Sequence, residues 1–209
     1  MSAIALRQGT HLPGSATPGE VPMINTPIEG VSTNQSYALR QNIIYYDGKF
    51  YIVYVYYNNP SYAEGNLMLT IYDPSTLSSN TITIDNSTLS VEGVASLGKD
   101  SILIVDADYV SGGYIDLFAY VYNLTTGALS GPFTIASSIW YDELPAVAYN
   151  PATDAWAVAY FVAGTTTTPI NITQFYVNVM KFSDGQPVLN VSVGPFTTVG
   201  GNISYATVS

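Results

Sequence analysis

IIYYDGKFYIVYVY, residues 43–56, contains two apolar stretches on either side of an Asp47-Gly48 pair. Tyr, Val and Ile favour strands, and an Asp-Gly pair is a frequent hairpin turn. In residues 49–56 the side chains of both strand faces are apolar or aromatic. This pattern is typical of a strand that is covered on two sides. We therefore predict a β-hairpin within a layered all-β fold.

The same pattern returns twice more along the chain, at intervals of roughly fifty residues. In each pass a short strand, a polar turn and a more apolar strand come first. A third strand ends at an aromatic residue (Tyr72, Tyr122 or Phe182), and a fourth follows, which twice contains Gly-Pro-Phe-Thr. The predicted strands are 39–46, 50–57, 67–72 and 81–84, then 91–97, 102–106, 114–122 and one that contains 131–134, then 144–149, 156–162, 172–182 and one that contains 194–197.

A repeat of this length is typical of propellers and stacked arrays. We predict a β-propeller-like array of three four-stranded antiparallel repeats, with a β-sandwich as the alternative. A closed propeller has about four to eight blades, so closure would need the chain termini or other subunits. No stretch longer than about ten residues keeps a helical period, so helix should be scarce.

The 209 residues are expected to form one all-β domain with an extended N-terminal arm. In the arm, residues 1–30, Pro and Gly interrupt every apolar run. Residues 3–8 resemble residues 37–41, so the arm either pairs as a strand with another sheet or wraps the surface. The domain is predicted at 31–209, with repeats at about 37–88, 89–141 and 142–202 and a last strand at 203–208.

The charge of the chain argues against nucleic-acid partners. Five Lys and Arg stand against 15 Asp and Glu, giving a net charge of −10, which repels phosphate. Charged residues make up only 10% of the chain, whereas about a quarter is usual. Solubility must therefore come from hydroxyl and amide groups or from attached sugar.

N-linked glycans are the expected modification. Six Asn residues stand in Asn-X-Ser/Thr triplets, mostly at predicted turns or strand ends from which a glycan would reach solvent. The alternative is that Asn, Ser and Thr are simply frequent in β-turns. The predicted sites are Asn34, Asn86, Asn123, Asn171, Asn190 and Asn202.

Catalytic residues are scarce in the sequence. Cysteine is absent, and the single histidine, His11, lies in the Pro-rich arm. Disulfides, thiol catalysis and a multi-His metal site are thereby excluded. No secretory signal is visible after Met1, and no apolar stretch is long enough for a transmembrane helix. We predict a non-enzymatic protein with no cofactor and no metal residue.

The carboxylates allow one alternative. Asp106-Ala107-Asp108 places two carboxylates on one face of a strand. Such a pair either holds a hard cation such as calcium or caps strand ends and faces water. We predict that these carboxylates cap strand ends and face water. Propeller glycosidases use carboxylates alone, so a glycan-binding or carbohydrate-active propeller is the rival function. Asp116 lies in the same local concentration of carboxylates, and the rival site would use Asp106, Asp108, Asp142, Glu143, Trp140 and Trp156.

Aromatic residues favour an assembly role. The chain has 18 Tyr, many of them in and around residues 45–62. A tyrosine ring is large and stiff while its hydroxyl tolerates water, which suits contact surfaces. We therefore expect a homo-oligomer that also contacts other structural proteins.

In composition, the chain resembles structural proteins of virions that infect hyperthermophilic archaea, in particular the small tail or nozzle protein of spindle-shaped fuselloviruses. The resemblance lies in the cysteine-free strands rich in Tyr, Asn and Thr, the six sequons and the start at residues 1–7. It implies a thermophilic viral protein in the virion, forming a ring that contacts an adaptor and a host-attachment spike. An archaeal surface-layer or filament subunit on the cell surface is the alternative, because its strand repeats are similar.

Overall fold

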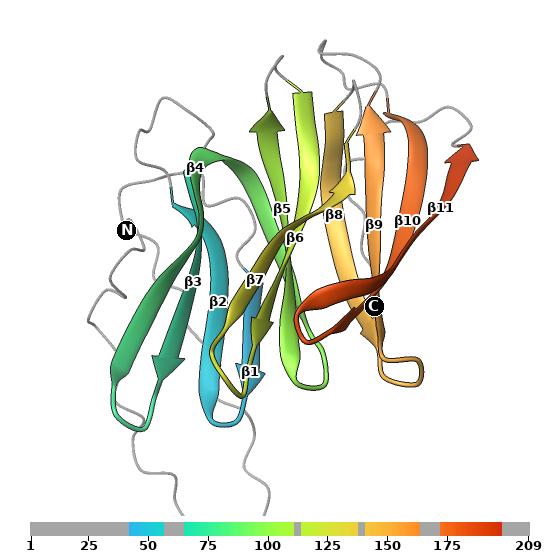
Figure 1. Cartoon of the computed structure of the whole chain (residues 1–209). Helices are drawn as coiled ribbons and strands as arrows, with labels where there is room; N and C mark the ends of the chain where they lie inside the picture. The colour runs from blue at the N-terminus through green and yellow to red at the C-terminus, as the bar shows by residue number, and fades with distance from the viewer. Residues whose placement is uncertain (1–41, 57–64, 111–113, 138–140, 164–171, 198–209) are drawn as a thin grey trace, which may run out of the picture.

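The computed structural model describes residues 42–56, 65–110, 114–137, 141–163 and 172–197. These residues form eleven strands and contain no helix, which confirms the all-β prediction. Figure 1 shows the strands standing side by side in groups. They are β1 (Asn42–Tyr46), β2 (Lys49–Tyr56), β3 (Gly65–Asp73), β4 (Ser78–Leu97), β5 (Ser101–Val110), β6 (Tyr114–Asn123), β7 (Leu129–Ala136), β8 (Tyr141–Asn150), β9 (Ala155–Ala163), β10 (Ile172–Ser183) and β11 (Gln186–Thr197).

The strands form three four-stranded antiparallel modules, as the repeats predicted. Module 1 contains β1, β2, β3 and the first half of β4, while module 2 contains the second half of β4 with β5, β6 and β7. Module 3 contains β8 to β11. β4 is continuous through two modules because its first half pairs with β3 and its second half with β5. One parallel bridge, Ile115 to Tyr141, connects modules 2 and 3.

Two of the hairpin turns have the backbone that their sequences favour. Asp47 and Gly48 have φ angles of 48° and 77°, and Asp184 and Gly185 have 50° and 72°. Two consecutive positive φ angles define the two-residue turn whose twist matches antiparallel strands. The Asp-Gly pairs therefore fix the registers of β1 with β2 and of β10 with β11.

We name the two faces of each module according to the order of the modules along the chain. The front face of modules 1 and 2 is the one that meets the next module, and the back face is the opposite one. The front face of module 3 is the one turned away from module 2. Modules 1 and 2 enclose one apolar core, in which Val53 and Leu69 of the front face of module 1 meet Ile104 of the back face of module 2. Modules 2 and 3 enclose the second core, in which Val105 and Leu117 meet Val158. The modules thus stack face to face in one direction, as sheets do both in a propeller-like array and in a sandwich.

Alternation along β5 explains why module 2 is apolar on both faces. Ile102 and Ile104 point to module 1, and Leu103 and Val105 point to module 3, and all four are fully buried. Successive side chains of a strand lie on opposite faces, so a middle sheet needs apolar residues at every position. β2 is also buried at every position from Tyr51 to Val55, as its sequence predicted.

A polar network joins module 3 to the outer strand of module 2. The buried Asn178 of β10 donates from Nδ2 to the Ile135 carbonyl of β7 at 2.9 Å and to Asn190 Oδ1 at 3.0 Å. Asn190 of β11 in turn donates to the Thr134 carbonyl at 3.2 Å. These bonds align β10 and β11 with β7, so the second interface is both apolar and hydrogen-bonded.

The two Gly-Pro-Phe-Thr segments adopt the same geometry in β7 and β11. Gly131 and Gly194 have φ angles of 122° and 135°, and both Gly-Pro bonds are cis. A Cβ at Gly131 would lie 2.7 Å from the Ala119 carbonyl oxygen, and one at Gly194 would lie 2.9 Å from that of Phe175. Both places need glycine because the neighbouring strand approaches the backbone too closely for a side chain.

Several predictions lie outside the described residues. They include the arm at 1–30, the last strand at 203–208, His11 and Trp140. Among the residues that the structure does describe, none belongs to a helix long and apolar enough to span a bilayer.

Candidate functional site: two end faces

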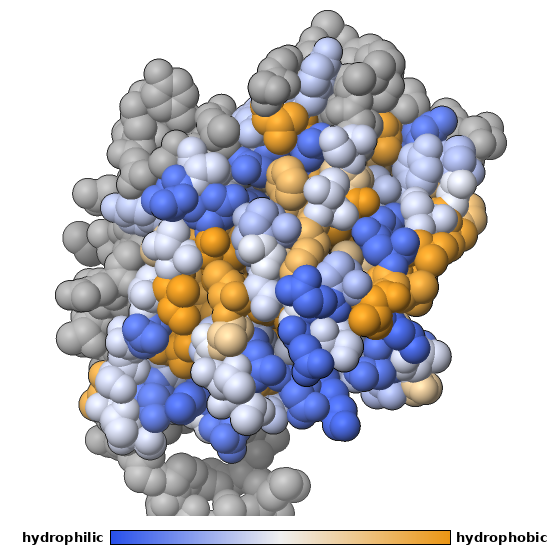
Figure 2. Space-filling view, in the orientation of Figure 1, coloured by the Kyte–Doolittle hydropathy of each residue, from blue (hydrophilic) through white to orange (hydrophobic). Residues whose placement is uncertain are grey.

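The front face of module 3 is apolar at the end of the stack. Phe161, Phe175 and Phe196 lie in a row across β9, β10 and β11, with ring centroids 5.1 Å and 5.8 Å apart. On β11, Val191, Val193 and Phe196 leave 47%, 44% and 48% of their surface exposed. Figure 2 shows hydrophobic surface following the path of β11. This face has no further module to cover it within the described residues.

The back face of module 1 is apolar at the opposite end. Ile43 and Tyr45 of β1 are each 62% exposed, and the Tyr45 ring lies 5.2 Å from that of Phe50 on β2. Ile52 and Tyr54 continue this face and are buried, although neither belongs to the two cores between modules. Isolated exposed apolar residues are ordinary, but Ile43 and Tyr45 lie at one edge with Phe50 beside them, and these three form a patch.

The repeat explains what the exposed residues would meet. Phe133 and Phe196 occupy the same place in the two Gly-Pro-Phe-Thr segments. Phe133, on the front face of module 2, packs against Phe182 of module 3 at 5.7 Å. Phe196, on the front face of module 3, is half exposed because the described chain supplies no fourth module. The phenylalanine of this repeated segment is thus covered by the next module in module 2 and left half exposed in module 3.

The acidic residues are placed differently from the prediction. Asp106 is fully buried, and Asp108 and Asp116 are each 7% exposed, so the expectation that they face water is wrong. β5 continues to Val110 instead of ending near residue 106, and its even-numbered side chains face module 1. The stacking of modules therefore buries these carboxylates. The tertiary structure also brings Asp85 of β4 close to Asp106 and Asp108. The sequence pattern did not single out Asp85.

The residues of the rival carbohydrate site do not converge. Asp106 and Asp108 point to the interface between modules 1 and 2, whereas Trp156 lies in the core between modules 2 and 3. Asp142 and Glu143 are consecutive residues of β8, and their backbones pair with β9. Trp156 is held in an aromatic cluster with Tyr149 and Phe182, at 5.0 Å and 5.8 Å. The sheet of module 2 lies between the carboxylates of Asp106 and Asp108 and the Trp156 ring.

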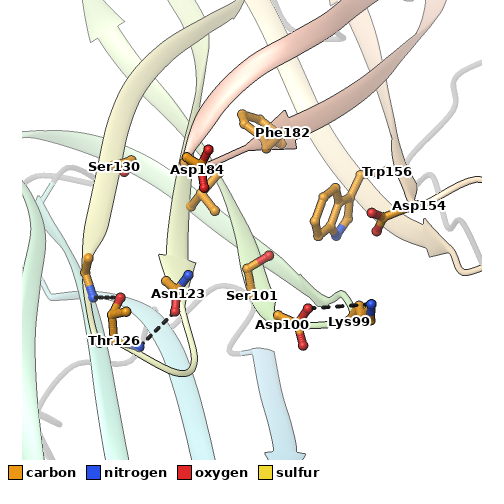
Figure 3. A pocket seen from close by; sticks show the side chains of 13 residues that line it. Lys99, Asp100, Ser101, Asn123, Thr126, Ser130, Asp154, Trp156, Phe182 and Asp184 are labelled. Carbon is orange, nitrogen blue, oxygen red and sulfur yellow. Dashed lines mark hydrogen bonds and ion pairs between the residues drawn. The ribbon is translucent and has the colours of Figure 1, made fainter.

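An open groove lies at the turn ends of modules 2 and 3. Trp156 and Phe182 form its apolar wall, and turn residues including Lys99, Asp154 and Asp184 form its polar wall. Figure 3 shows that these side chains come from several different turns. Trp156 and Phe182 serve the core as well as the groove, so their presence is explained by packing.

The three sequons that the structure describes differ in accessibility. Asn86 is exposed in β4. Asn123 ends β6, where its Oδ1 accepts bonds from the backbone N–H groups of Thr125 and Thr126 at 2.9 Å and 2.8 Å. Asn190 is exposed, but its Nδ2 already donates to module 2. Asn34, Asn171 and Asn202 lie outside the described residues.

Comparison with known proteins identifies no relative: no family model, curated protein or solved structure matches this chain.

Proposed function

We propose that this protein is a non-enzymatic structural subunit of an extracellular assembly, in which copies stack head to tail through their end faces. The observation that carries the proposal is the contrast between Phe133 and Phe196. One is packed against the following module and its repeat-equivalent is half exposed. The front face of module 3 is the surface that a following module would cover, and the β1 edge of the back face of module 1, where Ile43 and Tyr45 are exposed, is the matching surface of a second copy.

The repeated relation between modules supports this geometry. The front of module 1 meets the back of module 2, and the front of module 2 meets the back of module 3. A second copy added by the same relation continues the stack without a new kind of contact. Such a head-to-tail contact is heterologous, so it produces a ring if the rotation closes and a filament if it does not. Two copies would supply six modules, which is within the range of closed propellers.

We further propose that the assembly is the tail or nozzle of a virion. This step rests on the compositional resemblance, on the sequons and on the absence of cysteine. Other structural proteins of the particle would then be the partners, and N-linked glycans would cover the exterior. A surface-layer or filament subunit of an archaeal cell is the second candidate, because a stack that does not close also forms a filament.

Two charged variants test the stacking. Phe196→Glu places a charge on the front face of module 3, and Tyr45→Glu places one on the back face of module 1. Each variant alone should be monomeric in sedimentation velocity, because a buried unpaired charge disfavours the contact. An equimolar mixture should form dimers that grow no further, because each variant retains one intact face.

The control is Leu77→Ala, at a residue that is 59% exposed in the turn between β3 and β4, away from both end faces. This variant should assemble like the unmodified protein. If the unmodified protein is a monomer at all concentrations, the proposal is wrong. If either single variant still self-associates, or if the mixture of the two charged variants stays monomeric, the contact is not head to tail through these faces.

Native mass spectrometry of authentic material tests the biological setting. Measured before and after deglycosylation, it gives the number of subunits and the mass of sugar together. Detection of the chain in purified virions supports the virion assignment, and its recovery from cell envelopes without particles supports the second candidate. A glycan array and a glycosidase panel test the carbohydrate rival, for which we expect no signal.

A further inference from the structure

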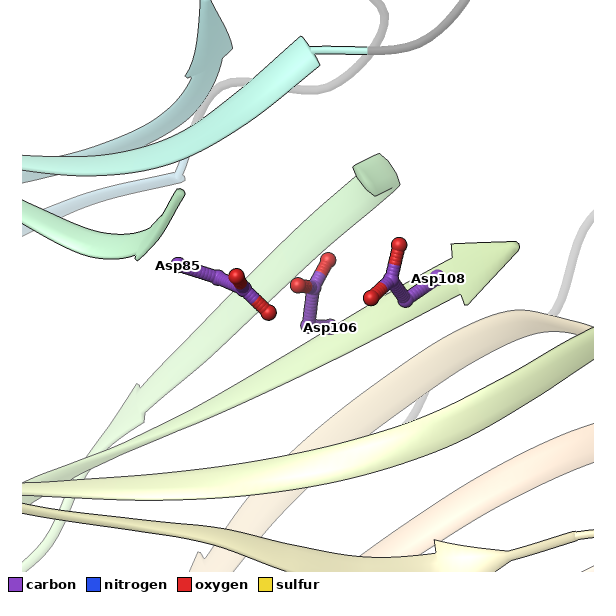
Figure 4. A group of neighbouring side chains, drawn as sticks. All are labelled: Asp85, Asp106 and Asp108. Atoms are coloured by element: carbon purple, nitrogen blue, oxygen red, sulfur yellow. The ribbon is translucent and has the colours of Figure 1, made fainter. Parts of the chain in front are cut away.

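Three carboxylates from two modules meet where β4 passes from module 1 to module 2. Asp85 belongs to the part of β4 that pairs with β3, and Asp106 and Asp108 belong to β5. Each offers an oxygen, and these oxygens all lie within 4.8 Å of one another. Figure 4 shows the Asp106 side chain between the other two. No pair of these residues is close in sequence except Asp106 and Asp108.

Asp106 supplies an independent sign that a ligand belongs here. It is fully buried, and its Oδ2 accepts a hydrogen bond from Ser90 Oγ at 2.8 Å, whereas its Oδ1 is buried without a hydrogen-bond partner. An orphaned buried carboxylate oxygen is costly. The fold itself therefore leaves one buried oxygen of this cluster without a partner, beside two further carboxylates.

We propose that Asp85, Asp106 and Asp108 bind a hard divalent cation of the calcium class. Calcium takes carboxylate oxygens at about 2.4 Å, so two oxygens on opposite sides of the ion stand up to about 4.8 Å apart. Magnesium demands shorter distances of about 2.1 Å and a strict octahedron. Oxygens within 4.8 Å of one another lie within the span of calcium's longer and more flexible bonds, and a charge of +2 offsets most of the combined charge of the three carboxylates.

The surrounding hydrogen bonds hold two of the ligands in place. Asp85 Oδ2 accepts from the Tyr120 hydroxyl at 2.7 Å, and its Oδ1 accepts from the Ser87 backbone N–H at 2.7 Å. The Ser87 hydroxyl donates to Asp108 Oδ2 at 3.2 Å. Residues that orient ligands from outside are a regular part of metal sites. Asp116, directly opposite Asp108 in the β5–β6 register, adds a further buried carboxylate beside the site.

A cation here would tie module 1 to module 2. Its ligands come from both modules, so binding the ion would link the two sheets at the point where β4 crosses between them. An ion that binds the folded state and not the unfolded chain stabilises the fold in proportion to the logarithm of its concentration. The ion is therefore structural, and this inference is independent of the head-to-tail contact.

Terbium luminescence and thermal unfolding test the site on the full chain. Tb³⁺ replaces Ca²⁺ at oxygen sites and is excited through nearby tyrosines, of which Tyr120 contacts Asp85. We expect tyrosine-sensitised emission that calcium displaces, and a melting temperature that rises with calcium after treatment with a chelator. Asp106→Asn should remove both responses, and Asp85→Asn should weaken calcium binding at least about tenfold, because the loss of even an outer-shell partner of a metal ligand typically costs that much.

The matched control is Asp184→Asn, in the β10–β11 turn, which removes an equal charge far from the cluster and should leave both responses unchanged. If Asp106→Asn does not fold, Asp85→Asn at the less buried end of the cluster decides the question. The proposal is overturned if the unmodified protein shows neither emission nor a calcium-dependent melting temperature, or if either cluster variant keeps the full response. An equal response to magnesium would overturn the assignment to the calcium class.

Discussion

Truncating Phe133 and Phe196 separates folding from assembly, because the two residues share one motif position. About 200 Å² is the surface of a phenylalanine side chain, so the 48% exposure of Phe196 leaves about 100 Å² to be covered. At about 25 cal/mol per Å², covering it contributes about 2.5 kcal/mol to a contact between copies. Phe196→Ala should therefore raise the dissociation constant by up to about 70-fold. The free energy of unfolding of the monomer should change little.

Phe133→Ala should have the opposite profile. The Phe133 ring is partly buried and packs against Phe182 beside the core between modules 2 and 3, so its removal should cost about 3 kcal/mol, the lower end of the range for a core phenylalanine. For a chain of 209 residues this lowers the melting temperature by about 6–12 °C. Front-face contacts between copies, which involve module 3, should persist at temperatures where the variant is folded.

Urea unfolding of dilute monomer measures the free energy of unfolding, and sedimentation equilibrium measures the dissociation constant between copies. Both variants lack the same atoms, so each is the control for the other. The reasoning is refuted if Phe196→Ala destabilises the monomer as much as Phe133→Ala does. It is equally refuted if Phe196→Ala assembles with an unchanged dissociation constant.

Three further predictions concern single positions. Gly131→Ala should lower the free energy of unfolding by about 3 kcal/mol in urea titrations, because a Cβ at φ 122° would meet the Ala119 carbonyl; unchanged stability would contradict this. Asn178→Ala should cost about 2–3 kcal/mol, because the Ile135 carbonyl and Asn190 Oδ1 lose their donor; Asn178→Asp cannot donate to the carbonyl, so full restoration of stability would disprove the donor role. Glycopeptide mass spectrometry should find higher occupancy at Asn86 than at Asn190, whose Nδ2 is already bonded; the reverse order would refute the accessibility argument.

The local parts of the fold could be predicted because local chemistry determines them. Asp47-Gly48 and Asp184-Gly185 form tight turns wherever they flank strand-forming residues, so two hairpins follow from the residues alone. The Gly-Pro-Phe-Thr repeat correctly marked two equivalent strands, and continuous apolar runs in β2 marked a sheet covered on both sides. The ends of strands were less well predicted, since β5 extends beyond its apolar centre by pairing with β6.

The acidic cluster shows where sequence reasoning stopped. Asp106 and Asp108 were recognisable as neighbours on one strand face, but nothing in the sequence said that module 1 would cover that face. Asp85 follows a predicted strand like many turn residues, and only the path of β4 across two modules brings it to the others. Burial and partner choice are long-range properties, so a pattern of local residues cannot contain them.

The residues alone determined that this chain forms three repeated four-stranded sheets, because strand alternation and turn geometry depend on neighbours a few positions apart. Only the tertiary structure decided which face of each sheet meets the next. The stacking of the modules left Phe196 exposed and packed Phe133 against the next module. It also brought carboxylates of two modules together, because stacking joins side chains that are distant along the chain.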